Sequence, residues 1–115
     1  MQKHNRPRRS RAKLEDAIAA ARHTSTKAHA HYAIALFHDN NSREAEAIPH
    51  YKQAIALGLP RLIRAQALAW LASSLYKTGA PEEALANLAK AKQLASDPEL
   101  LRFLEGLERR INRSP

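Results

Sequence analysis

One pattern of small and large apolar residues occurs twice in this chain, at a constant offset of 37 residues. The segment Glu46-Ala47-Ile48 corresponds to Glu83-Ala84-Leu85. Three further positions match in the same register: Tyr51 with Leu88, Ala54 with Ala91, and Leu57 with Leu94. A repeated unit of this size cannot bury both of its faces alone, so neighbouring units must stack into one continuous core. The chain is therefore expected to be a short stack of similar units.

Helical spacing of apolar residues extends over most of the chain. Alanine and leucine supply most of the 44% hydrophobic content and only 5% is aromatic, which favours closely packed helices over a sheet. Gly58, Gly79 and the Asp97-Pro98 pair are typical of helix ends and starts. We therefore predict an all-α fold with six helices, at about residues 11–22, 28–40, 43–57, 61–77, 81–94 and 98–111.

Two segments depart from this regular pattern. Residues 23–27 are rich in serine and threonine, and we expect them to break the chain between the first two helices. Pro49 lies inside the predicted helix 43–57, where it removes a backbone donor and costs on the order of 3 kcal/mol in an ideal helix. We expect a kink there, with either a late helix start or tertiary packing to compensate.

The net charge of +8 is concentrated at the two ends of the chain. Six positive charges lie within residues 1–13 and three within residues 109–113, whereas residues 14–108 carry ten lysines and arginines against eleven acidic residues. The body is therefore nearly neutral, and residues 1–10 are predicted to form a disordered basic arm. The arm lacks the apolar segment of a secretory signal, and no stretch approaches the roughly 20 apolar residues of a membrane span, so no membrane insertion is expected.

The repeated unit resembles the tetratricopeptide repeat. Its period is 34 residues plus three extra residues at Gly58-Leu59-Pro60. In a copy written from Ala65 to Pro98, the small-residue and turn positions of the family fall on Leu71, Ala72, Gly79, Ala84, Leu88 and Ala91. The segment 42–51 is also similar to a small bacterial subgroup of the family in which a proline interrupts the second helix of the repeat.

This resemblance implies a right-handed superhelix of about two repeats, at about residues 28–61 and 65–98, within a single domain of residues 11–112. A helix before the repeats and the helix at 98–111 would cap the stack. The earlier copy has Ser42 where glycine is usual at the turn, and the family's early tryptophan position holds His31 and Leu68. Two repeats are few for this architecture, so the caps or a second subunit must cover the open end.

The resemblance also implies a non-enzymatic scaffold that binds an unidentified protein, as a peptide or a partner helix, on the concave face of the stack. The positions that line this face hold the predicted contact residues Tyr32, Leu36, Trp70, Ser73, Tyr76 and Phe103. Some of them could instead pack in the core, as buried aromatic residues often do, and this alternative is open for Trp70 above all. The clamp of Lys, Asn and Arg that holds chaperone tails in some family members is absent here.

The sequence contains no apparatus for catalysis or for binding a cofactor. It has no glycine-rich phosphate loop and no serine in a nucleophile motif, and the lack of cysteine excludes disulfides and thiolate metal sites. His29 and His31 point to different sides of one helix, and His31 and His38 lie roughly 10 Å apart along its axis, so we predict no metal site. The lack of cysteine also suits a cytoplasmic location.

Two other functions are open. The basic arm could contact nucleic acid or an anionic surface through Arg6, Arg8, Arg9 and Arg11, and such contacts would be largely independent of base sequence. Alternatively, the chain could form a homodimer through the concave face or through the apolar edge of its last helix, which has more apolar residues than one helix face needs. These residues are Leu100, Leu101, Phe103, Leu104, Leu107 and Ile111.

Overall fold

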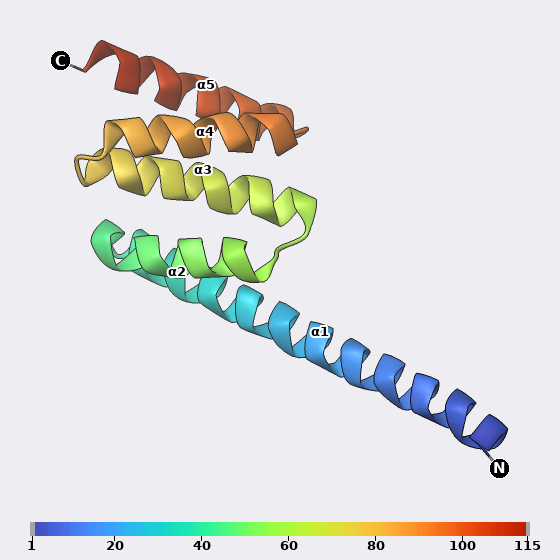
Figure 1. Cartoon of the computed structure of the whole chain (residues 1–115). Coiled ribbons are helices and arrows are strands. Elements are labelled where there is room, and N and C mark those ends of the chain that lie inside the picture. Colours follow the sequence, from blue (N-terminus) through green and yellow to red (C-terminus); the bar gives the residue numbers. More distant parts are fainter. Residues whose placement is uncertain (1, 115) are drawn as a thin grey trace.

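The computed structural model describes the backbone of residues 2–114 and the side chains of residues 15–114. Its five helices are α1 (Gln2–Asn40), α2 (Glu44–Leu57), α3 (Arg61–Lys77), α4 (Pro81–Leu94) and α5 (Pro98–Arg113). Each helix packs beside the next in chain order, and α3 also contacts α5 (Figure 1). No strand occurs within residues 2–114, and the predicted all-α class is confirmed.

Helix α1 runs through residues 23–27, so the predicted break at this segment is wrong. The Thr24 hydroxyl donates to the Ala20 carbonyl at 2.9 Å, and the Thr26 hydroxyl donates to the Arg22 carbonyl at 2.9 Å. Hydroxyl groups that bond back by one turn are satisfied without leaving helical geometry. Residues 2–114 therefore form five helices rather than six, and α1 extends past the end of α2 (Figure 1).

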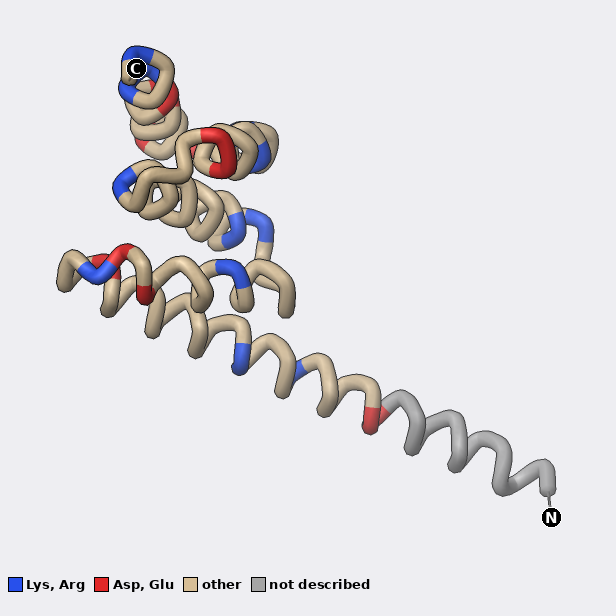
Figure 2. The backbone as a smooth tube through the Cα atoms, turned by 60° about the vertical axis from the view of Figure 1, so that its left-hand side comes forward, with Lys and Arg blue, Asp and Glu red and all other residues tan. Residues whose placement is uncertain are grey.

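Alanines without exposed surface line the contacts between helices. A methyl side chain lets two helix backbones approach closely, which sets the spacing of the whole stack. Many of these alanines recur at the repeat offset predicted from the sequence, as Ala35 and Ala72 do. The fully buried set includes Ala28, Ala35, Ala47, Ala54, Ala72, Ala84 and Ala91. Figure 2 shows the same stack from a second angle, with charged residues of both signs spread along it.

Tyr51 is the largest fully buried side chain and ties α2 to the end of α1. Its hydroxyl donates to Asp39 Oδ2 at 2.7 Å. Burial is the main cause that raises the pKa of the Tyr51 hydroxyl, and the hydrogen bond to Asp39 raises it further. The hydroxyl therefore remains a donor at every physiological pH, and the core has a permanent polar link at the α1–α2 turn.

The two repeat turns use different residues at the same position. Gly79 has φ +90°, and Ser42, 37 residues earlier, has φ +59°. Glycine adopts this left-handed conformation without steric cost, whereas a residue with a Cβ atom is strained by roughly 1–2 kcal/mol. The first turn therefore keeps the repeat geometry despite an unfavourable residue.

Pro49 lies within α2, and the helix begins at Glu44. A late helix start therefore does not explain how the proline is tolerated. The Pro49 ring is exposed, whereas Ala47, Tyr51 and Ala54 of the same helix are buried. The helix therefore continues past the proline while its opposite face packs in the core, which agrees with the alternative of tertiary packing.

Helix α5 begins with a side-chain cap, because Asp97 Oδ2 accepts the backbone N–H of Leu100 at 3.2 Å. Four of the apolar residues predicted for a dimer contact are buried within the chain: Leu100, Leu104, Leu107 and Ile111. Leu101 and Phe103 are half-buried. The apolar surplus of the last helix is therefore mostly covered by α3 and α4, and homodimerisation stays a prediction.

We expect Tyr51→Phe to lower the free energy of unfolding by about 1–2 kcal/mol, because the Asp39 carboxylate loses its donor in a partly buried position. Urea denaturation would measure the change. Tyr76→Phe, which removes a hydroxyl at the exposed end of the stack, is the control and should cost less. Equal losses in the two variants would contradict the structural role given to the Tyr51 hydroxyl.

We expect opposite effects of substitution at the two repeat turns. Ser42→Gly should raise the free energy of unfolding by up to about 1 kcal/mol, because it relieves the strained φ angle. Gly79→Ala should lower it by about 1 kcal/mol, although the added methyl group would meet no atom within 4 Å. Thermal unfolding of both variants measures the two changes in stability. A stabilising Gly79→Ala would disprove this explanation.

Candidate functional site

Three aromatic side chains, Tyr32, Trp70 and Phe103, form a row across α1, α3 and α5, which we call the aromatic row. The Trp70 indole N–H donates to the Tyr32 hydroxyl at 3.2 Å. The Trp70 and Phe103 rings meet edge to face, with centroids 5.0 Å apart. All three rings pack against the core and are half-buried, so one side of the row remains at the surface.

The hydroxyl group of Tyr32 links α1 to α3 at the aromatic row. Besides accepting from Trp70, the hydroxyl donates to Gln66 Oε1 at 3.2 Å. Burial raises the pKa of Tyr32, and the hydrogen bond from Trp70 lowers it to a smaller extent. The hydroxyl therefore stays protonated at physiological pH, and the rings of α1 and α3 are fixed relative to each other.

The other predicted contact residues lie beside the aromatic row rather than in it. The Tyr76 hydroxyl is 2.6 Å from Ser114 Oγ and joins the end of α3 to the end of α5. Leu36 packs against the core and, like Ser73, is half-buried. The structure thus brings Trp70 into contact with both Tyr32 and Phe103 and leaves Tyr76 bonded at a separate point. Trp70 packs against the core on one side and reaches the surface on another, so its role as a contact residue stays a prediction.

A hollow of about 260 Å³ lies beside the aromatic row, where α3 meets the start of α5. Trp70 and Phe103 supply its aromatic lining, and Gln66 and Leu100 also line it. Asp97 and Glu99 add two carboxylates at its edge. Such a hollow suits an apolar group with a positive charge nearby.

A family model described as tetratrico peptide repeat matches residues 28–108. The chain belongs to the tetratricopeptide repeat family. The matched residues begin within α1, end within α5 and include the whole aromatic row. Repeats of this family generally mediate protein–protein interactions and act as non-enzymatic scaffolds. No curated protein and no solved structure matches the chain.

A second hollow of this tetratricopeptide repeat protein lies on the face formed by α2 and α4, over α3. Its volume is about 560 Å³. None of its lining residues was predicted from the sequence as a contact residue. Ala56 and Ala86, at outer positions of the second helix in each repeat, line the hollow, but an alanine in a helix gives no sequence signal for a binding surface.

Three histidines meet where α1 packs on α2. His31 Nδ1 and His50 Nδ1 are 3.0 Å apart, and their rings stack with centroids 5.2 Å apart. The His38 ring stacks on the other side, 5.9 Å from the His50 centroid. Since one Nδ1 must donate and the other accept, His31 and His50 cannot both carry a proton there. Sequence spacing within one helix missed this cluster, because His50 comes from the next helix.

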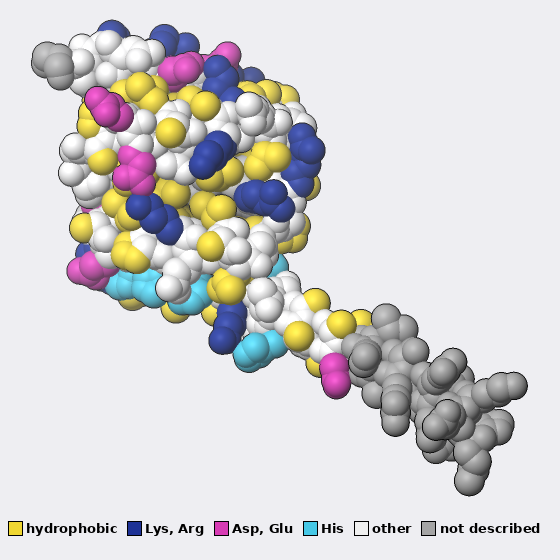
Figure 3. All heavy atoms as spheres, viewed as in Figure 1, with side chains coloured by type: hydrophobic (Ala, Val, Ile, Leu, Met, Phe, Trp, Pro, Cys, Tyr) yellow, Lys and Arg dark blue, Asp and Glu magenta, His cyan; other side chains and the backbone are white. Residues whose placement is uncertain are grey.

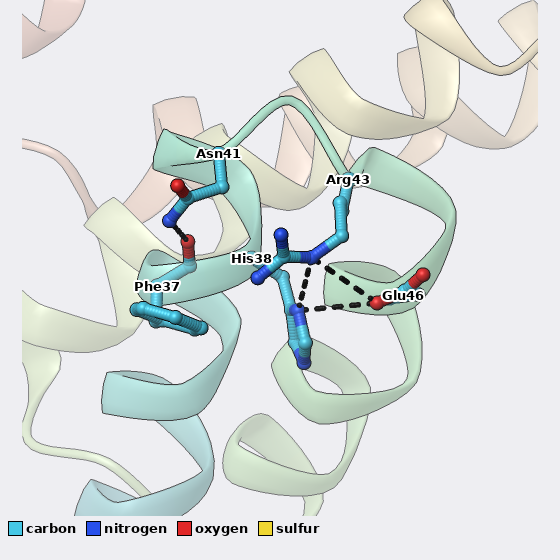
Figure 4. Close-up of polar contacts among 5 residues, drawn as sticks. All are labelled: Phe37, His38, Asn41, Arg43 and Glu46. Carbon is cyan, nitrogen blue, oxygen red and sulfur yellow. Dashed lines mark hydrogen bonds and ion pairs between the residues drawn. The ribbon is translucent and has the colours of Figure 1, made fainter.

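The α1–α2 turn adds two charged groups to this cluster. Arg43 Nε donates to His38 Nδ1 at 3.1 Å and lies 3.3 Å from Glu46 Oε2 (Figure 4). Glu46 Oε2 is also 3.2 Å from His38 Nδ1. Asn41 closes the turn, because its side-chain amide donates to the Phe37 carbonyl at 2.7 Å. Arg43, His38 and Glu46 therefore form one polar network at the α1–α2 turn.

The described side chains give no other centre of chemistry. Within residues 15–114, no group of three or more His, Asp and Glu residues is arranged to hold a metal ion. None of the described helices is both long enough and apolar enough to cross a membrane. Helix α1 includes residues 2–10, for which the sequence predicted a disordered arm. The side chains of Arg6, Arg8, Arg9 and Arg11 lie outside the described residues, so their contact with nucleic acid stays a prediction.

We expect stability to fall as the pH drops from about 6.5 to about 5.5. Burial, followed by the charges of His31 and His38, lowers the pKa of His50 below its ordinary 6.5. The unfolded chain therefore binds this proton more strongly than the folded chain. The contribution of His50 is fully present above pH 6.5 and is lost as the pH falls from 6.5 towards the lowered folded pKa.

Thermal midpoints measured across this pH range test the expectation. His50→Gln should flatten the dependence on pH, because it removes the group whose pKa changes on folding. His23→Gln, at an exposed position of α1, should leave the slope unchanged. A slope that survives His50→Gln in full would show that other groups cause it.

Proposed function

We propose that this chain is a non-enzymatic scaffold that binds a peptide or a partner helix across the face formed by α1, α3 and α5. The observation that carries the proposal is the aromatic row, which continues without interruption over all three helices. Half-buried aromatic residues at the centre of a surface are typical anchors for protein binding. Leu36, Ser73 and Tyr76 would extend the contact along the same helices.

The row is organised before any partner arrives. Tyr32 is fixed by Trp70 and Gln66, and Trp70 is fixed by Tyr32 and Phe103. Side chains that are already ordered lose little conformational entropy on binding, so more of the contact energy contributes to affinity. This order supports a binding role over a role in core packing alone.

The proposed ligand has an apolar or aromatic side chain next to a lysine or arginine. The apolar group would enter the hollow against Trp70 and Phe103. The basic group would meet Asp97 and Glu99 at the edge of the hollow. Charge complementarity of this kind adds specificity as well as affinity.

We also propose that the chain belongs to the bacterial subgroup with a proline in the second helix of the repeat, and that it acts in the cytoplasm. The position of Pro49 within α2 supports the first statement. The cysteine-free composition supports the second, because disulfides are rare in a reducing compartment.

Trp70 is the only tryptophan of the chain and therefore reports on binding at the aromatic row. We expect peptides selected from a displayed random library against the full chain to shift Trp70 fluorescence and to contain an apolar residue beside a basic one. Gln66→Arg should weaken this binding about tenfold, because it places a positive charge at the hollow. Gln53→Arg, the same change at an exposed position of α2, should leave affinity unchanged.

Circular dichroism of both variants would establish that the fold is intact. Peptides that bind without moving Trp70 fluorescence, or that lose equal affinity in both variants, would contradict the proposed surface. Binding that instead disappears when residues 1–13 are deleted would favour the basic arm.

A further inference from the structure

The hollow between α2 and α4 has the form of an open groove. Helices α2 and α4 run in the same direction, with α3 between and beneath them (Figure 1). Figure 3 shows hydrophobic side chains gathered in the middle of this face, with lysine and arginine side chains around them. The lining residues of α4 run from Glu83 to Leu94, which corresponds to about 16 Å or three helical turns.

The groove is open because two small residues occupy its walls. Ala56 of α2 and Ala86 of α4 are both exposed, and their methyl groups leave the space between the helices unfilled. Ile55 and Leu94 are half-buried and present apolar surface to this space. The volume of about 560 Å³ is in the range of specific binding sites.

The charges at the groove are mostly positive. Lys52 Nζ and Glu83 Oε2 form an ion pair of 2.8 Å that joins α2 to α4 at the groove. The Arg64 Nε and Nη2 groups donate to the Leu59 carbonyl at 3.2 and 3.1 Å, which fixes the guanidinium position. Among the described side chains, the ion pairs include neither Arg64 nor Lys90. Two cations at the groove therefore lack a carboxylate partner.

We propose that the groove between α2 and α4 binds an acidic amphipathic helix of another protein. Its apolar stripe would pack against Ile55, Ala86 and Leu94, and its carboxylates would pair with Arg64 and Lys90. A helix fits because α4 forms a wall about three turns long, which α2 faces over the turn from Lys52 to Ala56. Residues at i, i+3 or i+4, and i+7 of the ligand helix reach one side. This surface is separate from the aromatic row and would take a ligand of the opposite charge.

The apolar walls of the groove favour an acidic helix over a nucleic acid as its ligand. Nucleic-acid affinity comes mainly from several phosphate contacts, whereas this groove has only two cations without a carboxylate partner and includes Glu83. An acidic helix uses both features of the groove, since its apolar side is buried while its carboxylates meet the cations. Because the cations are exposed, binding should also weaken with added salt.

A displayed library of helical peptides tests the proposal directly. The probes are designed helices of about four turns with surface positions randomised among Leu, Ala, Gln, Lys and Glu. We expect selection on the full chain to enrich helices with a leucine stripe flanked by glutamates. Ala86→Glu should abolish their binding, because it fills the groove and repels the carboxylates. Lys90→Glu should weaken it about tenfold.

Matched controls keep the result specific to the groove. Ala89→Glu lies at an exposed position of the same helix outside the groove lining, and Arg102→Glu makes the same charge reversal as Lys90→Glu on α5. Neither should change the affinity. Enrichment of lysine-rich helices, failure to enrich any helix, or binding that survives Ala86→Glu would overturn the proposal. Trp70 fluorescence should not respond to these helices. The proposal for the groove can therefore be contradicted without contradicting the proposal for the aromatic row.

Discussion

Close contact through alanine is the constraint on which the rest of this structure depends. Fully buried methyl groups at matching positions of the repeat bring each helix against the next. Larger side chains either fill the core beside these alanines, as Tyr51 and Leu88 do, or lie at the two sides of the stack. On one side they meet as the aromatic row, where Tyr32, Trp70 and Phe103 come from three different helices. On the other side, small residues leave the groove between α2 and α4.

The repeat register allowed most of the fold to be predicted from sequence. The pairs Ala35 and Ala72, and Ala47 and Ala84, lie at the predicted offset and are buried as expected. The break at residues 23–27 was predicted wrongly, because composition does not reveal that the Thr24 and Thr26 hydroxyls bond back within the helix. Ser42 had been recognised as an unusual turn residue, and its positive φ shows that tertiary packing keeps the turn geometry in spite of the residue.

The candidate site could be predicted only in part, for a physical reason. Position within the repeat placed Tyr32, Trp70 and Phe103 on the same side, but not the bond between the indole and the phenol, whose partners are 38 residues apart. The histidine cluster depends on His50 from a second helix in the same way. The groove could not be predicted from the sequence, because an alanine in a sequence indicates only that a helix is favoured. Only the packed structure shows that Ala56 and Ala86 leave a space that their neighbours do not fill.

The two surfaces differ in charge although the body of the chain is nearly neutral. Carboxylates of Asp97 and Glu99 flank the aromatic hollow, whereas Arg64 and Lys90 lie at the groove. Within the Debye length of about 8 Å at physiological salt, the proposed ligand of each surface would be attracted by the charges of that surface. The net charge of +8 acts on both ligands at longer range. The ligands proposed for the two surfaces have opposite charges, so each surface would repel the ligand that the other attracts.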